Sequence, residues 1–175
     1  MPLDLQNNSI GVLFVCLGNI CRSPMAEAVF NSMVRERNMG MVIHCDSAGT
    51  GDYHIGSRPH PGTLNVLEAA GIETLHRARQ LTLHDFSQYT HILVMDRDNL
   101  RDTLALASGP AEIQLITNFS DLYPGCDVPD PYFDGRFDVV FEMVTNACTG
   151  FLDRYEARLK LEGSSPTQQV NHGRS

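Results

Sequence analysis

The order of apolar and polar residues along the chain predicts short strands separated by helices. Residues 10–15 form a near-continuous apolar run, IGVLFV, which is typical of a strand buried on both faces. Residues 42–45, 91–95 and 113–116 form three further short runs that are rich in β-branched residues and bounded by turn formers. We therefore expect four strands in this chain.

The segments between these runs have the spacing of helices. After the first run, apolar residues recur three or four positions apart, as Ala26, Val29, Phe30, Met33 and Val34. In this helix we expect Ser23 as the N-cap, Pro24 at the first helical position and Gly40 at the end. Further helices are expected at residues 61–70, from about residue 97, and from residue 137 to Gly163.

Strands that alternate with helices predict an α/β fold with a central parallel sheet of about four strands and helices on both faces. A single domain is expected at residues 9–162, between an N-terminal extension at residues 1–8 and a polar, disordered tail at residues 163–175. Ligands of such sheets bind at the carboxyl ends of the strands. The loop between the first strand and the first helix lies at that edge.

Composition and charge exclude several classes of function. The net charge of −8 argues against a partner that is nucleic acid or an anionic membrane surface. No apolar run approaches the roughly 20 residues of a membrane span, and residues 1–9 do not resemble a secretory signal. Five cysteines, an odd number, favour free thiols in a reducing cytoplasm.

The histidines and cysteines do not have the spacing of a metal site. The seven histidines include no H-E-x-x-H pattern, and the five cysteines include no C-x-x-C pattern. The chain also lacks a Walker motif and a G-x-G-x-x-G fingerprint. We therefore expect no metal and no cofactor.

A cysteine and an arginine flank the loop after the first strand, with five residues between them. Cys16 ends the strand, and Arg22 precedes the start of the helix. The pKa of a free cysteine is about 8.5, and a helix N-terminus or a nearby cation lowers it. We therefore expect a nucleophilic thiolate at Cys16. The alternative is a small buried cysteine that only packs at the end of the strand.

The other residues of this loop suit the binding of phosphate. Backbone N–H groups can form an anion cradle at Leu17, Gly18, Asn19, Ile20 and Cys21. Gly18 and Asn19 suit positions that need a positive φ. The guanidinium of Arg22 matches two phosphate oxygens, and the hydroxyl of Ser23 can donate to the sulfur.

The segment CLGNICRSPMAE, residues 16–27, resembles the phosphate loop of the low-molecular-weight protein tyrosine phosphatases. Four later segments resemble the family as well, in order along residues 9–160: DSAGT at 46–50, HRARQL at 76–81, Met95-Asp96 and Asp130-Pro131-Tyr132. The resemblance implies a protein tyrosine phosphatase, a phosphoric monoester hydrolase that forms a phosphocysteine at Cys16. Its substrates would be phosphotyrosine-containing proteins or small aryl phosphates.

Protonation of the leaving phenolate needs a general acid, and the acidic loop offers several. By composition the candidates are Asp127, Asp130, Asp134 and Asp138. Pro129 and Pro131 restrict the backbone around Asp130. The resemblance also selects Asp130, as general acid in the first step and general base in the second.

The resemblance assigns further residues to the pocket. It places aromatic walls at Tyr53 and Tyr132 and a supporting hydrogen-bond network at Asn19, Ser47 and His76. From the residues alone, Tyr53 could equally be half exposed on the surface, and His76 could be a surface histidine. Family members that prefer phosphoarginine usually carry threonine at the position of Ile20, so Ile20 implies phosphotyrosine.

The resemblance also bears on Cys21 and on Phe133, while three other cysteines have no role in it. In the family, the pair that matches Cys16 and Cys21 can form a reversible disulfide; Cys21 could instead simply pack behind the loop. The other three cysteines, Cys45, Cys126 and Cys148, are expected to be structural. Many family members carry a second, phosphorylatable tyrosine where this chain has Phe133.

Two other functions remain open on the same loop. An arsenate reductase would need further cysteines as a relay, and Cys126 and Cys148 are not an obvious pair. A non-catalytic phosphate-binding module is the third possibility. It is expected to have lost Cys16, Arg22 or Asp130, and this chain keeps all three.

Overall fold

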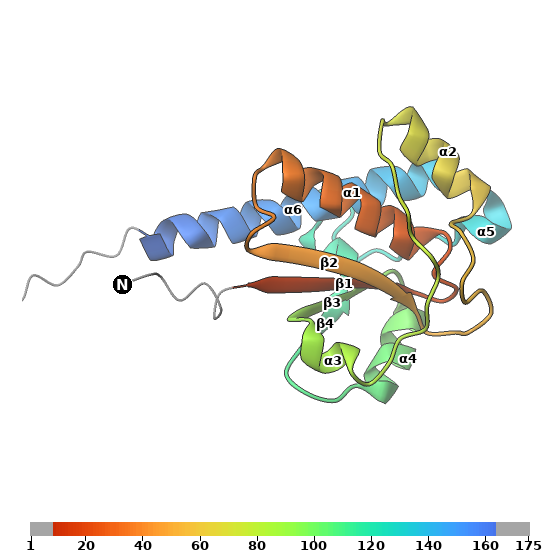
Figure 1. Ribbon diagram of the computed structural model, residues 1–175, viewed down its shortest axis with the longest axis horizontal. Coiled ribbons are helices and arrows are strands. Elements are labelled where there is room, and N and C mark those ends of the chain that lie inside the picture. The colour runs from red at the N-terminus through yellow and green to blue at the C-terminus, as the bar shows by residue number, and fades with distance from the viewer. Residues whose placement is uncertain (1–8, 164–175) are drawn as a thin grey trace, which may run out of the picture.

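The computed structural model describes residues 9–163, which form a four-stranded parallel sheet with helices on both faces (Figure 1). The strands are β1 (Ile10–Cys16), β2 (Ile43–Gly49), β3 (His91–Val94) and β4 (Glu112–Leu115), in the order β2-β1-β3-β4. The predicted α/β fold is confirmed. The extension predicted at residues 1–8 and the tail predicted beyond residue 163 lie outside the described residues.

Helices cover both faces of this sheet. In Figure 1, α1 (Arg22–Glu36), α2 (Pro61–Ala69) and α6 (Phe137–Gly163) lie on one side of it. On the other side lie α3 (Asp85–Gln88) and α4 (Arg97–Leu106). Two single turns, η1 (Ile116–Phe119) and α5 (Pro131–Asp134), complete the elements. The elements α3, η1 and α5 were not predicted, because four residues are too few for a hydrophobic period.

The central strand β1 supplies side chains to two cores. Phe14 packs edge-to-face on Phe30 of α1, with ring centroids 5.3 Å apart, and Phe30 packs on Phe151 of α6 at 5.7 Å. Leu13 and Val15 point to the other face and pack in the cluster that includes α3. Full burial of each such side chain stabilises the fold by about 1.5–3 kcal/mol. The alternation explains why β1 is apolar throughout.

Two predicted ends of α1 are wrong. The helix begins at Arg22, so Ser23 lies inside its first turn, and the N-cap residue Cys21 makes no side-chain cap hydrogen bond. The helix ends at Glu36, where Asn38 rather than Gly40 takes the left-handed conformation, with a φ of 56°. Asparagine tolerates this conformation better than most residues.

Strand β2 is longer than its apolar run. It pairs with β1 over seven residues up to Gly49, although Asp46 and Ser47 are polar. The chain passes from β1 to β2 on one side and later to β3 on the other side of β1. The carboxyl end of β1 is therefore the switch point at which ligands of such sheets bind. Among residues 9–163, none of the helices has the length and apolarity that crossing a bilayer requires.

Candidate active site

The loop that follows β1 is attached to the end of β2 by backbone hydrogen bonds. Thr50 N–H donates to the carbonyl of Cys16, and Gly51 N–H donates to the carbonyl of Leu17, each at 2.9 Å. A Cβ atom at Gly49 would lie 2.6 Å from the Leu17 carbonyl oxygen, so this close approach requires glycine. The contacts fix where the Cys16 side chain leaves the sheet.

The Cys16 sulfur lies beside a hydroxyl whose proton is directed by a neighbour. Ser23 Oγ is 3.0 Å from Cys16 Sγ, and the same oxygen accepts a hydrogen bond of 2.8 Å from Asn19 Nδ2. Because Asn19 can only donate through its amide nitrogen, the Ser23 proton is left for the sulfur. Within residues 9–163, no backbone N–H of residues 17–21 donates to a backbone carbonyl, which leaves these groups for an anion.

Asn19 is the centre of the network that holds this loop. It is fully buried and takes a left-handed conformation, with a φ of 55°. Its side chain donates to Ser47 Oγ at 3.0 Å and accepts from the backbone N–H of Arg79 at 2.9 Å, while its carbonyl accepts from His76 Nε2 at 3.0 Å. The structure thus brings Asn19, Ser47 and His76 together, and these contacts hold the strained conformation in place.

The side chain of His76 is buried, not exposed on the surface. Its side chain is 3% exposed, and its Nδ1 lies 3.1 Å from Glu27 Oε2 and 3.4 Å from Ser47 Oγ. Burial and a hydrogen bond with Asp46 raise the pKa of Glu27, while His76 opposes that rise. Sequence reasoning missed Glu27 as a network residue. The signal was its position four residues after Ser23, on the same face of α1.

Arg22 is held by groups from two other elements. Its side chain is 3% exposed and donates to Asp96 Oδ2 at 2.5 Å and to the Val128 carbonyl at 3.0 Å. Burial alone would lower the pKa of Arg22, but the neighbouring Cys16, Asp96 and Asp130 outweigh it and raise that pKa. Asp96 is also the N-cap of α4, which was not foreseen.

Among the four candidate aspartates, Asp130 is the one that faces the loop. Its Oδ2 lies 3.5 Å from Arg22, and its Oδ1 accepts from the backbone N–H of Tyr132 at 3.1 Å. Asp127 pairs with Arg97, Asp134 pairs with Arg136, and Asp138 is exposed on α6. Asp127 and Asp134 therefore belong to partly exposed ion pairs, and neither lines the cavity.

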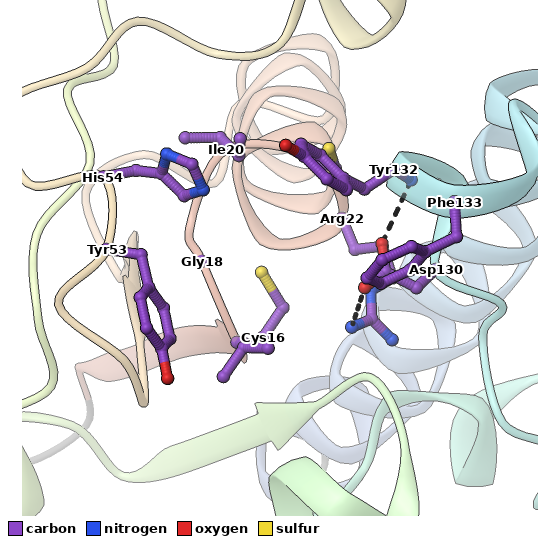
Figure 2. Close-up of a pocket in the computed structure, with 11 residues that line it drawn as sticks. Cys16, Gly18, Ile20, Arg22, Tyr53, His54, Asp130, Tyr132 and Phe133 are labelled. Atoms are coloured by element: carbon purple, nitrogen blue, oxygen red, sulfur yellow. Dashed lines mark hydrogen bonds and ion pairs between the residues drawn. The ribbon is translucent and has the colours of Figure 1, made fainter.

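A cavity of about 290 Å³ with aromatic walls is lined by Cys16, Arg22 and Asp130. Figure 2 shows the Cys16 sulfur between Tyr53 on one side and Tyr132 and Phe133 on the other. Ile20 and His54 line the cavity as well. Tyr53 is 73% exposed, so it both lines the pocket and lies on the surface at the rim. Phe133 and His54 were not predicted as pocket residues.

Comparison with known proteins decides the family. The model of the family "Low molecular weight phosphotyrosine protein phosphatase" matches residues 11–164. The chain belongs to this family. The human phosphatase of that name is 39% identical over 149 residues, which cover 82% of this chain and 94% of the human protein. YfkJ of Bacillus subtilis is 38% identical over 155 residues, 87% of this chain and 99% of YfkJ.

Solved structures of the phosphatase family show the same fold. The crystal structure of YfkJ superimposes with a TM-score of 0.82 at 37% identity, over 86% of this chain and 96% of YfkJ. A structure named drosophila arginine phosphatase superimposes with a TM-score of 0.77 at 32% identity, over 83% of this chain and 97% of that one.

A second cysteine of this phosphatase lies in the same cavity. Burial, together with the proximity of Cys16 and Asp130, raises the pKa of Cys21 to about 12. Cys21 is therefore a neutral thiol at pH 7. Cys148 is buried in the core and Cys126 is exposed, and neither lines the cavity.

Proposed function

We propose that this protein hydrolyses phosphotyrosine, and small aryl phosphates, through a phosphocysteine at Cys16. The observation that carries the proposal is the convergence of Cys16, Arg22 and Asp130 in one cavity with aromatic walls. Family membership supports the reaction class. The geometry supports the division of roles among the three residues.

In the first step the Cys16 thiolate attacks phosphorus, and an S–P bond forms as the P–O bond to the phenolate breaks. The Arg22 guanidinium and the amides of residues 17–21 bind the phosphoryl oxygens, where negative charge is concentrated. Asp130, protonated, gives its proton to the leaving oxygen. The buried contacts of Arg22 with Asp96 and Val128 keep its donors oriented for this task.

In the second step Asp130, now a carboxylate, takes a proton from water. The water oxygen attacks phosphorus, the S–P bond breaks, and inorganic phosphate leaves. The sulfur departs as a thiolate, and the Ser23 hydroxyl at 3.0 Å stabilises it by a hydrogen bond. Cys16 and Asp130 thereby regain the protonation states with which they began.

The shape of the cavity supports an aryl substrate. A phenyl ring between Tyr53 and Tyr132 brings its phosphate to the loop, whereas phosphoserine lacks a ring to fill these walls. Ile20, which is 8% exposed, supplies an apolar wall without a hydrogen-bond acceptor for a guanidinium. We therefore place phosphotyrosine before phosphoarginine, although one structural relative is named an arginine phosphatase.

The test is hydrolysis of p-nitrophenyl phosphate in the presence of EDTA. We expect full activity, complete loss of turnover in Cys16→Ser with retained binding of inorganic phosphate, and normal activity in the control Cys126→Ser. Hydrolysis by Cys16→Ser would contradict the mechanism. Arsenate reduction that depends on thioredoxin would favour the reductase instead, although neither Cys126 nor Cys148 lines the cavity.

We also propose a cytoplasmic location. The nucleophile must remain a reduced thiolate, and Cys21 lies in the same cavity as a potential disulfide partner. A reducing compartment keeps such thiols free. The protective disulfide predicts that a reductant restores activity to the wild type after peroxide treatment, whereas peroxide inactivates Cys21→Ser irreversibly.

A further inference from the structure

We infer that His60 is a positioning residue. By packing against Tyr132, it holds the general-acid loop, which contains Asp130, against the phosphate loop at residues 17–21. The inference rests on the proposed function and extends it to a residue outside the cavity lining. His60 belongs to neither loop. It precedes α2, and its contacts reach both.

The backbone and the side chain of His60 are fixed at the start of α2. Its backbone N–H donates to the carbonyl of Ile20, in the phosphate loop, at 2.8 Å. Its Nδ1 accepts from the backbone N–H of Gly62 at 3.0 Å and so caps the helix. An accepting Nδ1 carries no proton, which places the ring proton on Nε2. Thr63 also donates to the Cys21 carbonyl at 3.1 Å, so this first turn holds the phosphate loop at two points.

The imidazole ring contacts two aromatic rings from other elements. It stacks on Phe137, the first residue of α6, with centroids 4.9 Å apart and planes at 21°. It also contacts Tyr132, with ring centroids 6.0 Å apart and ring planes at 76°. A Cβ atom at Gly62 would collide with the Phe137 ring, so the helix start and this ring are tightly packed. Phe137 in turn packs on Ile20 and Cys21.

The position of Tyr132 bears directly on the general acid. Tyr132 is two residues after Asp130, and its backbone N–H donates to Asp130 Oδ1 at 3.1 Å. Movement of Tyr132 would therefore turn the carboxyl group away from the leaving oxygen. Since His60 is bonded to the phosphate loop and packed against Tyr132, it sets the distance between nucleophile and acid.

Two substitutions of His60 test separately the packing of its ring and its role as the N-cap of α2. His60→Asn keeps a good N-cap acceptor but removes the ring, and His60→Phe keeps a ring but removes the acceptor. We expect His60→Phe to lower Tm by about 2–4 °C, the usual cost of a lost cap in a chain of this size, and to leave the dependence on the leaving group unchanged. His84→Asn is the matched control, because His84 is an exposed histidine that precedes a helix without capping it.

The readout is kcat/KM for aryl phosphates whose phenols span a range of pKa values. In His60→Asn we expect a loss of about 3- to 10-fold for phenyl phosphate, the size of a typical coupling between neighbouring residues, and a much smaller loss for p-nitrophenyl phosphate. Inhibition by inorganic phosphate should be unchanged. In a Tyr132→Ala background, His60→Asn should add less than about twofold, because the two residues act through one contact.

Equal losses for all leaving groups in His60→Asn would overturn the inference, and so would full additivity with Tyr132→Ala. In either case the proposed function would stand, provided that Asp130→Ala still shows the leaving-group dependence of a lost acid. If Asp130→Ala lacks that dependence, the assignment of Asp130 as general acid and this inference fail together, whereas the phosphocysteine at Cys16 is tested separately by Cys16→Ser.

Discussion

Asp130 differs from the other aspartates of its loop in what it contacts. It is near Arg22 at the cavity, whereas Asp127 pairs with the exposed Arg97. For Asp130→Ala we expect kcat/KM on phenyl phosphate to fall by about 10²–10⁴-fold, the usual contribution of a general acid. The loss should shrink for p-nitrophenyl phosphate, whose leaving group needs less protonation.

Asp127→Ala is the control for this measurement, because it removes a carboxylate from the same segment without touching the cavity. Its activity should be within about twofold of wild type, as for a surface ion pair. If Asp130→Ala and Asp127→Ala lose kcat/KM by the same factor, and if that factor is the same for all leaving groups, the general acid is another residue.

We propose that Ile20, which lines the cavity, controls the choice between a phenyl ring and a guanidinium. Replacing Ile20 by threonine shortens one wall of the cavity and adds a hydroxyl that can accept from a guanidinium N–H. We expect Ile20→Thr to raise the ratio of phosphoarginine to phosphotyrosine turnover by about tenfold or more, as one added hydrogen bond in a pocket can. Peptide assays measure this ratio. An unchanged ratio would show that specificity lies elsewhere.

At the scale of elements, Arg79 joins the segment before α3 to Asp85 of α3 and to Asp46 of β2. We call these ion pairs the clamp. The guanidinium donates two hydrogen bonds of 3.0 Å to Asp85 and a third, also of 3.0 Å, to Asp46 of β2, while the Arg79 backbone supports Asn19. Burial alone would raise the pKa of Asp85, but hydrogen bonds from Arg79 and Thr82 outweigh it and lower that pKa. The clamp therefore depends on pH.

A carboxyl group whose pKa is lowered in the folded state adds stability above its unfolded pKa of about 3.9, and that stability is lost as the pH falls further. We expect Asp85→Asn to lower the free energy of unfolding by about 2 kcal/mol at pH 7, since a buried charged hydrogen bond is lost. In urea titrations at pH 3 the difference from wild type should shrink.

The control for the clamp is Asp98→Asn. Asp98 pairs with Arg101 on exposed α4, with 80% of its side chain exposed, and such pairs contribute less than about 1 kcal/mol. An Asp85→Asn variant that loses the same stability at pH 3 as at pH 7 would show that the clamp is not ionic.

The elements with long hydrophobic periods were predictable, and those that depend on distant contacts were not. The apolar run of β1 and the spacing of α1 and α6 predicted the sheet and its main cover. The helix start was misplaced because Ser23 reads locally as a cap, whereas its hydroxyl contacts Cys16. No local period marks His60 or Arg79, whose roles come from neighbours far away in the sequence.

At the scale of the molecule, the parallel sheet gathers segments far apart in the sequence at one edge (Figure 1). The end of β1 carries Cys16, the end of β3 leads to Asp96, and the loop before α6 brings Asp130. The net charge of the chain is −8, so the positive field that we propose for phosphate binding is local, from Arg22 and backbone amides. Catalysis in this account depends on a covalent bond from Cys16 to phosphorus.

Trapping that bond is the most direct test. In Asp130→Ala, p-nitrophenyl phosphate should still phosphorylate the enzyme, because its leaving group hardly needs an acid, while hydrolysis of the intermediate is slow without the base. Rapid quenching and peptide mass spectrometry should then find phosphate on Cys16, with a matching burst of nitrophenolate. Steady turnover with no phosphate on Cys16, or with phosphate on another residue, would contradict the account.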